Sequence, residues 1–171
     1  MPEKQFDVAK FIDFSKPFID ASKNIFKQMD QTELETGKPF LKEKIQSQGD
    51  ISAVIGINGV YKNGDSSSEF RGQFVISFPT STYLKVASAM LMEEYTEFNE
   101  EIADVGAEIC NMIIGNAKGE LVRKGYEIEM AIPSVVSGIG HTIQYLSDVN
   151  IIVTPIQSGH GEFYMEICYN E

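Results

Sequence analysis

The stretch EFNEEIADVGAEICNMIIGNAKGELVRK, residues 97–124, decides the fold because it predicts one long amphipathic helix. At about 100° per residue, four apolar residues share one side of this helix beside the small Gly106: Ile102, Val105, Ile109 and Ile113. Asp104, Glu108 and Asn111 lie almost opposite, in a stripe that Glu97, Glu101 and Gly115 extend. Thr96 is the expected N-cap, and Gly125 ends the helix. The pattern predicts a helix that buries its apolar side and presents two carboxylates and a carboxamide to solvent.

The polar stripe, defined as Asp104, Glu108 and Asn111, is unfavourable for an isolated helix. Carboxylates four residues apart repel by about 0.2–0.5 kcal/mol, and Asn is a poor residue for a helix interior because its side chain competes for the backbone. The helix dipole favours acidic residues only in the first turn, which the prediction places at 97–101. We therefore interpret the stripe as a surface that a partner uses. An ordinary solvated helix face is the alternative.

The composition bounds the class of protein. The length of 171 residues predicts a single domain, residues 1–171. The sequence contains 25 acidic and 14 basic side chains, which gives a net charge of −11. This charge argues against nucleic-acid binding and suits a partner whose contact patch carries Lys or Arg. The sequence has neither a secretory signal nor a run of transmembrane length, and its two cysteines, Cys110 and Cys168, lack metal or redox spacing. We expect a cytoplasmic protein with reduced thiols and no membrane partner.

Further helices and strands are predicted on both sides of this segment. One helix covers residues 16–29, with Ser15 as N-cap and Pro17 in its first turn, and another runs from about 80 to 93. Turn sequences at 63–68 and 158–161 predict hairpins. The predicted strands are residues 40–48, 51–60, 69–78, 126–132, 142–146, 150–155 and 162–169.

A faint internal repeat relates the two halves of the chain. Aligning the two long helices puts Asp20, Asn24 and Lys27 over Asp104, Glu108 and Asn111, so the first copy keeps the Asp and loses the Glu and the Asn. Each helix is followed by strands and a hairpin. The pattern predicts a pseudo-twofold α/β or α+β domain, in which long helices pack on a mostly antiparallel sheet.

Several other residues have more than one interpretation. Met112 and Ile114 lie near the two edges of the stripe, where they belong either to the core or to an apolar rim for docking. Glu101 and Gly115 are the other candidates for a docking rim. His141 and His160 stand alone in or beside glycine-containing loops, and His160 is expected to face solvent. Neither has a second ligand at zinc spacing, so we expect no metal site.

Asp104, Glu108 and Asn111, followed by Pro133 just over twenty residues later, resemble the signature of the CheC/CheX/FliY phosphatases of bacterial chemotaxis. Two further stretches resemble CheX proteins: KPFIDASKNIF at 16–26, and PSVVSG at 133–138 with His141. The chain has one intact signature, where CheC typically has two, which makes the CheX branch the closer match.

The resemblance implies a CheC-like fold and dephosphorylation of a phosphorylated CheY-type response regulator. It implies that Glu108 pairs with the regulator's active-site lysine, that Asn111 aligns the attacking water, and that Asp104 supports them. A carboxamide suits this task because it can donate to and accept from one water. Pro133 is expected to fix the chain next to the helix. The resemblance also implies a homodimer with no cofactor of its own, the Mg2+ belonging to the regulator. The rival interpretation is a non-catalytic adaptor or flagellar-switch module that binds a regulator.

Overall fold

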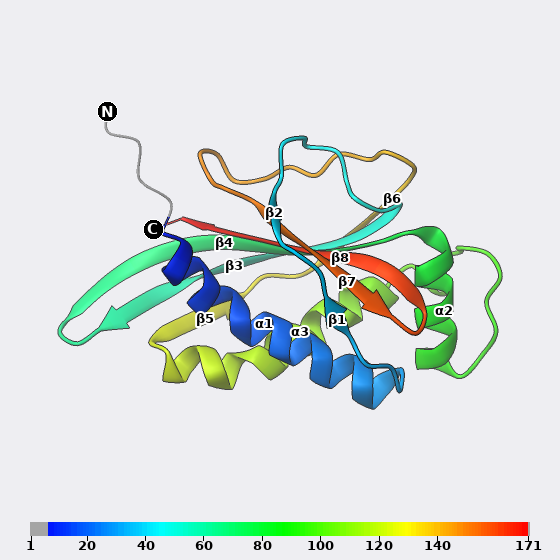
Figure 1. Cartoon of the computed structure of the whole chain (residues 1–171), viewed down its shortest axis with the longest axis horizontal. Helices are drawn as coiled ribbons and strands as arrows, with labels where there is room; N and C mark the ends of the chain where they lie inside the picture. Colours follow the sequence, from blue (N-terminus) through cyan, green and yellow to red (C-terminus); the bar gives the residue numbers. More distant parts are fainter. Residues whose placement is uncertain (1–6, 171) are drawn as a thin grey trace.

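The computed structural model describes residues 7–170, in which three helices and eight strands form two layers (Figure 1). The helices are α1 (Val8–Met29), α2 (Thr80–Leu91) and α3 (Val105–Arg123). The strands are β1 (Glu35–Thr36), β2 (Phe40–Leu41), β3 (Ile51–Asn63), β4 (Ser66–Phe78), β5 (Tyr126–Met130), β6 (Ser134–Ser137), β7 (Ile152–Ser158) and β8 (Gly161–Asn170).

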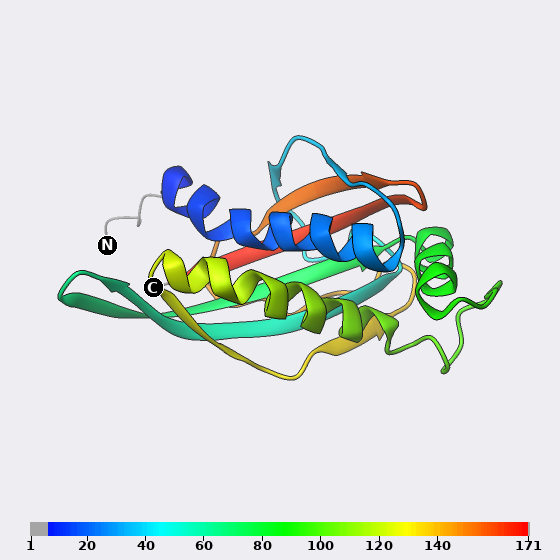
Figure 2. The same cartoon turned by 90° about the horizontal axis from the view of Figure 1, so that it is seen from below.

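All eight strands belong to one sheet, and every pairing in it is antiparallel. The order is β1-β7-β8-β4-β3-β5, with β2 also on β7 and β6 also on β3. α1 and α3 lie side by side on one face of the sheet and run in opposite directions, while α2 lies at one end (Figures 1 and 2). The loops that follow β2 and β6 cross the other face (Figure 1). The predicted α+β architecture with long helices on an antiparallel sheet is confirmed.

The sheet order shows how the two halves are related. Each long helix is followed by two short strands and a hairpin: α1 by β1, β2 and β3–β4, and α3 by β5, β6 and β7–β8. The short strands cross over, because β1 and β2 pair with β7 whereas β5 and β6 pair with β3. β4 and β8 then meet in the middle of the sheet, with Phe74 opposite Ile167. This exchange covers one edge of each hairpin with strands from the other half.

The core between helices and sheet is rich in aromatic rings. Phe18 of α1 stacks on Phe74 of β4 at 5.6 Å, and Phe26 stacks on Phe163 of β8 at 4.9 Å. Near its N-terminal end, α3 approaches the sheet closely, because a Cβ on Gly106 would stand only 3.3 Å from the Cβ of Ala53. Burial of each large apolar side chain contributes roughly 1.5–3 kcal/mol to the free energy of folding, and this stabilises the packing of both long helices on the sheet.

The first helix starts earlier than predicted. α1 begins at Val8, and the carboxylate of Asp7 caps it by accepting a hydrogen bond from the Lys10 amide at 3.0 Å. The predicted N-cap Ser15 is therefore wrong; its hydroxyl instead donates to the Ile12 carbonyl within the helix.

Pro17 consequently lies inside α1, where a proline removes the hydrogen bond to the carbonyl four residues earlier. That carbonyl belongs to Asp13, and it accepts a hydrogen bond from Lys124 Nζ at 3.0 Å. The same ammonium pairs with the Asp13 carboxylate at 3.0 Å. A side chain at the end of α3 thus replaces the bond that Pro17 cannot make.

Three strand predictions also need correction. The strand expected over 40–48 is only β2, and residues 142–146 form no strand beyond an isolated bridge between Gln46 and Thr142. Both segments instead cross the helix-free face, where the Leu146 amide donates to the Gln73 side chain. The strand expected over 126–132 ends at Met130, and β6 follows Pro133 on the same partner strand, because proline cannot donate to the ladder.

Candidate functional site

The helix that carries the polar stripe begins later than predicted. Residues 92–104 form bends and turns, and α3 starts at Val105 with Asp104 as its N-cap residue, so the predicted N-cap Thr96 is wrong. Asn99 explains the difference, because its side-chain oxygen accepts a hydrogen bond from the Glu101 amide at 2.9 Å. Such local bonds from Asn compete with helix formation.

The later start changes the electrostatic interpretation of the stripe. Glu108 lies in the first turn of α3 and Asp104 just before it, where the helix dipole favours carboxylates. The inference that both lie beyond the reach of the dipole was therefore wrong. Asn111 is in the next turn, and the dipole gives no reason for a carboxamide there.

The stripe lies on the outward side of α3, whose opposite side is buried. Asp104 and Glu108 are exposed and Asn111 is half-buried, whereas Ile109, Cys110 and Ile113 on the other side of α3 are buried. Among residues 7–170, the side chains of Glu108 and Asn111 make neither a hydrogen bond nor an ion pair. A carboxylate and a carboxamide are thus held three residues apart on a rigid support, with their polar atoms available to another molecule.

The surroundings of the stripe differ in part from the predicted rim. Glu101 and Gly115 are exposed, and a Cβ on Gly115 would meet nothing within 4 Å. Met112 is half-buried and packs against the core. Ile114 is fully buried and does not form a surface rim, because the turn of the helix directs it to the same side as Cys110. The alternative that assigned Ile114 to the core is therefore correct.

Pro133 lies half-buried between β5 and β6, which both flank α3. Just before it, Ile132 is 91% exposed, an apolar surface residue that the sequence did not single out. The connection that carries these two residues runs along the sheet edge on the α3 side (Figure 2).

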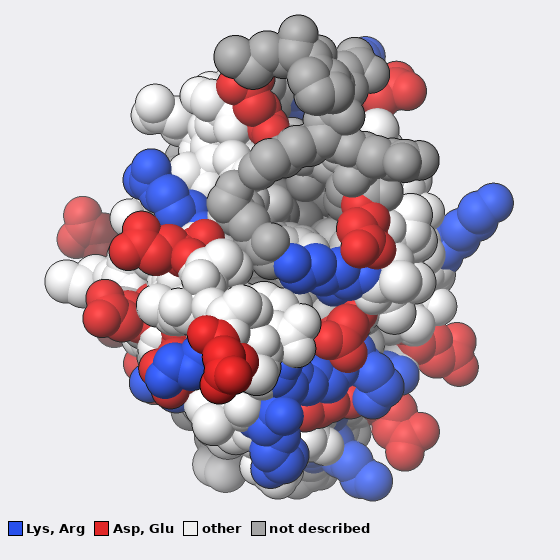
Figure 3. Space-filling view, turned by 90° about the vertical axis from the view of Figure 1, so that its left-hand side faces the viewer, with Lys and Arg blue, Asp and Glu red and all other residues white. Residues whose placement is uncertain are grey.

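Charge is unevenly distributed around the molecule. Residues 92–108, which lead into the stripe, contain seven acidic residues and no Lys or Arg, and all seven are exposed: Glu93, Glu94, Glu97, Glu100, Glu101, Asp104 and Glu108. At the end of the molecule that carries the β3–β4 turn, basic and acidic side chains are interspersed (Figure 3). The approach to Glu108 therefore favours a partner with a basic contact patch.

His141 is not isolated, in contrast to the prediction. Its Nε2 lies 2.7 Å from Ser52 Oγ, and its Nδ1 lies 2.8 Å from the Gly138 carbonyl oxygen. Ser52 Oγ is in turn 2.8 Å from Ser77 Oγ, and both serines are fully buried. A substrate cannot reach a buried hydroxyl, so this pair of serine and histidine secures the loop at 138–141 to β3 and β4.

His160 also differs from expectation, since it is half-buried with Nε2 3.4 Å from the Asp30 carbonyl. Burial raises the pKa of the Asp30 carboxyl to about 6, and the charge of His160 opposes this shift. Cys110 and Cys168 are free and buried, and burial raises the pKa of both thiols. Within residues 7–170, no group of three or more His, Cys, Asp or Glu residues is arranged to hold a metal ion. The same residues contain no helix long and apolar enough to span a membrane.

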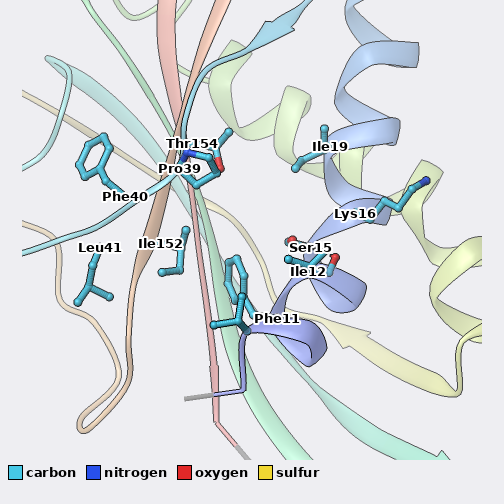
Figure 4. Close-up of a pocket in the computed structure, with 11 residues that line it drawn as sticks. Phe11, Ile12, Ser15, Lys16, Ile19, Pro39, Phe40, Leu41, Ile152 and Thr154 are labelled. Carbon is cyan, nitrogen blue, oxygen red and sulfur yellow. Dashed lines mark hydrogen bonds between the residues drawn. The ribbon is translucent and has the colours of Figure 1, made fainter. Parts of the chain in front are cut away.

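A second surface feature lies away from the stripe. An apolar groove of about 480 Å³ opens between the first half of α1 and strands β2 and β7 (Figure 4). Its exposed side chains include Val8 and Ile12, at 57% and 58% exposure, and Phe40 and Leu41, at 42% and 52%. Sequence reasoning missed it because Val8 and Ile12 precede the predicted start of the first helix.

Comparison with known proteins bears directly on this arrangement. Residues 51–157 match the family model described as "Chemotaxis phosphatase CheX". The chain belongs to the CheX family. It is 33% identical over 107 residues to the CheY-P phosphatase CheX of Thermotoga maritima. The aligned region covers 62% of this chain and 63% of that protein.

Solved structures of CheX-like proteins share the fold over almost the whole chain. A CheC-like superfamily protein from Shewanella sp. PV-4 has a TM-score of 0.80 and 37% identity, covering 97% of this chain and all 100% of that one. CheX from Borrelia burgdorferi, solved in a complex with CheY, BeF3 and Mg2+, has a TM-score of 0.74 and 26% identity, covering 94% and 99% of the two chains. The resemblance first indicated by Asp104, Glu108 and Asn111 is thus confirmed at the level of family and fold.

Proposed function

We propose that this CheX-family protein accelerates the dephosphorylation of a phosphorylated CheY-type response regulator. The observation that carries the proposal is the outward presentation of Glu108 and Asn111, three residues apart on one rigid helix and without partners among residues 7–170. Membership of the CheX family and a relative named as a CheY-P phosphatase support the same reaction.

Glu108 is proposed to bind the regulator's active-site lysine and so to orient the complex. Its carboxylate is exposed and belongs to an acidic approach, which attracts a basic partner and aligns it during encounter. A charge-assisted hydrogen bond between carboxylate and ammonium is about twice as strong as a neutral one, so the pair also gives the complex a defined orientation. Asp104, one turn earlier, adds negative charge on the same side of the helix.

Asn111 is proposed to hold the attacking water in line with the acyl phosphate of the regulator. Its amide can donate to and accept from the same water, which fixes the direction of a lone pair. The water oxygen forms a bond to phosphorus while the bond from phosphorus to the aspartyl oxygen breaks, which releases phosphate and restores the carboxylate. Such a reaction depends mainly on the positioning of the reacting groups, and partial burial restricts the motion of the Asn111 side chain. The divalent metal for this step belongs to the regulator, so we expect no cofactor in this chain.

The test is the lifetime of a phosphorylated regulator with and without the protein. The wild type is expected to shorten it, and Asn111→Ala is expected to abolish the acceleration while binding is retained. Asn116→Ala is the matched control, because Asn116 is exposed on the same helix but faces α1, where it accepts a hydrogen bond from Asn24. Glu108→Lys is expected to weaken binding itself. Regulator lifetimes that stay unchanged for every regulator tried would refute the proposal, and binding without acceleration would favour an adaptor.

We also propose that two copies associate through the apolar groove between α1 and β2. The groove gathers exposed apolar side chains from two separate segments, and β2 lies at an edge of the sheet where unpaired backbone groups need covering. Because each chain carries a net charge of −11, association requires an apolar contact that outweighs repulsion. Light scattering should give a dimer for the wild type and a monomer for Ile12→Glu. Ile139→Glu is the control, since Ile139 is 95% exposed and does not line the groove. A monomeric wild type would contradict the proposal.

A further inference from the structure

The start of α3 is held by a tyrosine from another helix. Tyr83, on α2, is fully buried, and its hydroxyl donates to the Ile102 carbonyl at 2.6 Å. The same oxygen accepts a hydrogen bond from the Gly106 amide at 2.9 Å. The ring packs between Phe78 and Phe98, with centroids 5.5 and 5.6 Å away. One side chain therefore connects α2 to the last residues of the loop and to the first turn of α3.

The Tyr83 hydroxyl acts as the N-terminal cap of α3 by accepting a hydrogen bond from a first-turn amide. Asp is among the best N-cap residues, because in an extended conformation its carboxylate accepts the amides of the first turn. Asp104 instead has φ −85° and ψ −3°, and its side chain makes no capping hydrogen bond. Tyr83 supplies the acceptor for Gly106, so the carboxylate of Asp104 is exposed rather than occupied by its own helix.

Position 106 leaves little room for a side chain. A Cβ there would stand 3.4 Å from Tyr83 Cε2 and 3.3 Å from the Ala53 side chain, which is closer than most real contacts. Burial raises the pKa of the Tyr83 phenol to about 12, so the hydroxyl keeps its proton and can donate at any physiological pH. Tyr83 and Gly106 thus form one matched contact between α2 and α3.

We propose that Tyr83 is a positioning residue for the phosphatase reaction: by capping α3 in place of Asp104, it sets where Asp104 and Glu108 meet the regulator. This inference rests on the function proposed above. The contact acts at residue 106, two residues before Glu108, whereas Asn111 lies in the next turn of α3, where Cys110 and Ile114 are buried in the core. Tyr83 therefore governs recognition of the regulator more than alignment of the water.

Tyr83→Phe tests the inference, because it keeps the ring and removes the hydroxyl. We expect KM for the phosphorylated regulator to rise about tenfold, the factor that corresponds to roughly 1.4 kcal/mol, while kcat stays within about twofold. The Gly106 amide should also exchange its hydrogen faster than in the wild type. Thr82→Val is the matched control, since the adjacent buried hydroxyl on α2 donates to the Glu162 carbonyl of β8 and not to α3. We expect this variant to lose stability but to keep the wild-type KM.

The outcomes separate this inference from the proposed function. A wild type that leaves every regulator's lifetime unchanged overturns both. An active wild type with Tyr83→Phe at the same KM and the same Gly106 exchange overturns the role of Tyr83 alone. An equal rise in KM for Thr82→Val also overturns it, because general loosening of α2 would then explain the effect.

Discussion

Removing one member of the buried ion pair between Lys42 and Glu166 should destabilise the fold far more than removing both charges. The two side chains are 1% and 0% exposed, and their charged atoms are 2.6 Å apart. They lie on the helix-free face of the sheet, where Tyr145 also donates to Glu166 at 2.9 Å. The second oxygen of Glu166 is buried and has no hydrogen-bond partner among residues 7–170. Within the described residues 7–170, Lys42 is thus the only cation paired with this carboxylate.

Lys42→Met leaves the carboxylate buried without its counterion. Breaking such a pair typically costs about 3–5 kcal/mol, because the remaining charge keeps its desolvation penalty. For a chain of this size, each kcal/mol lowers Tm by roughly 2–4 °C, so the expected loss is about 6–20 °C. The double variant Lys42→Met/Glu166→Gln keeps an acceptor for Tyr145 and removes both charges. It should recover most of the loss, with a coupling of roughly 2–4 kcal/mol.

Urea unfolding at pH 7, followed by circular dichroism, measures the free energies of unfolding of the wild type, Lys42→Met, Glu166→Gln and the double variant, which together form a double-mutant cycle. Lys44→Met is the control, because Lys44 is exposed two residues further along the chain. A cost of less than about 1 kcal/mol for Lys42→Met would contradict this prediction, since the pair would then be no better than an exposed one. A double variant as unstable as Lys42→Met alone would also contradict it.

Two further predictions concern the ends of the long helices. Asp30→Asn should stabilise the protein at pH 8 by about 1–2 kcal/mol and have little effect at pH 4. The raised pKa of about 6 means that the folded state holds the Asp30 proton more tightly than the unfolded state, so the wild type loses stability as pH rises from about 4 through 6. Urea unfolding across this pH range measures it, and a pH-independent difference would contradict the assignment to Asp30. Lys124→Met should cost about 1–2 kcal/mol, since it leaves the Asp13 carbonyl without the bond that Pro17 cannot supply. The exposed Lys118→Met is its control in the same unfolding assay, and equal effects of the two would show that the bond to Asp13 contributes nothing.

The local periodicity of the sequence was sufficient to predict much of the fold and the position of the candidate site. The buried side of α3, with Ile109 and Ile113, follows from apolar spacing alone, because one face of a helix must be covered. The β3–β4 hairpin follows in the same way from apolar strands on both sides of a turn sequence. The outward direction of Glu108 is the complement of the buried face. Neighbours in sequence determine each of these features.

Other features depend on residues far apart in the chain. The start of α3 is decided by Asn99 within the preceding loop and by Tyr83 on α2, so periodicity extended the helix too far. The Asp13 carbonyl, which Pro17 leaves without its helical hydrogen bond, is satisfied by Lys124 from the end of α3. His141 looked isolated because its hydrogen-bond partner Ser52 belongs to β3, and Ser77, which is bonded to Ser52, belongs to β4.

The amino-acid sequence by itself determined that a helix with one apolar side would offer an acid and an amide to another molecule, because both properties repeat with the pitch of the helix. Only the tertiary structure decided where that helix begins, which apolar residues lie at the surface and which strands cross between the halves. Those outcomes depend on contacts between segments that only folding brings together, and no local pattern records them.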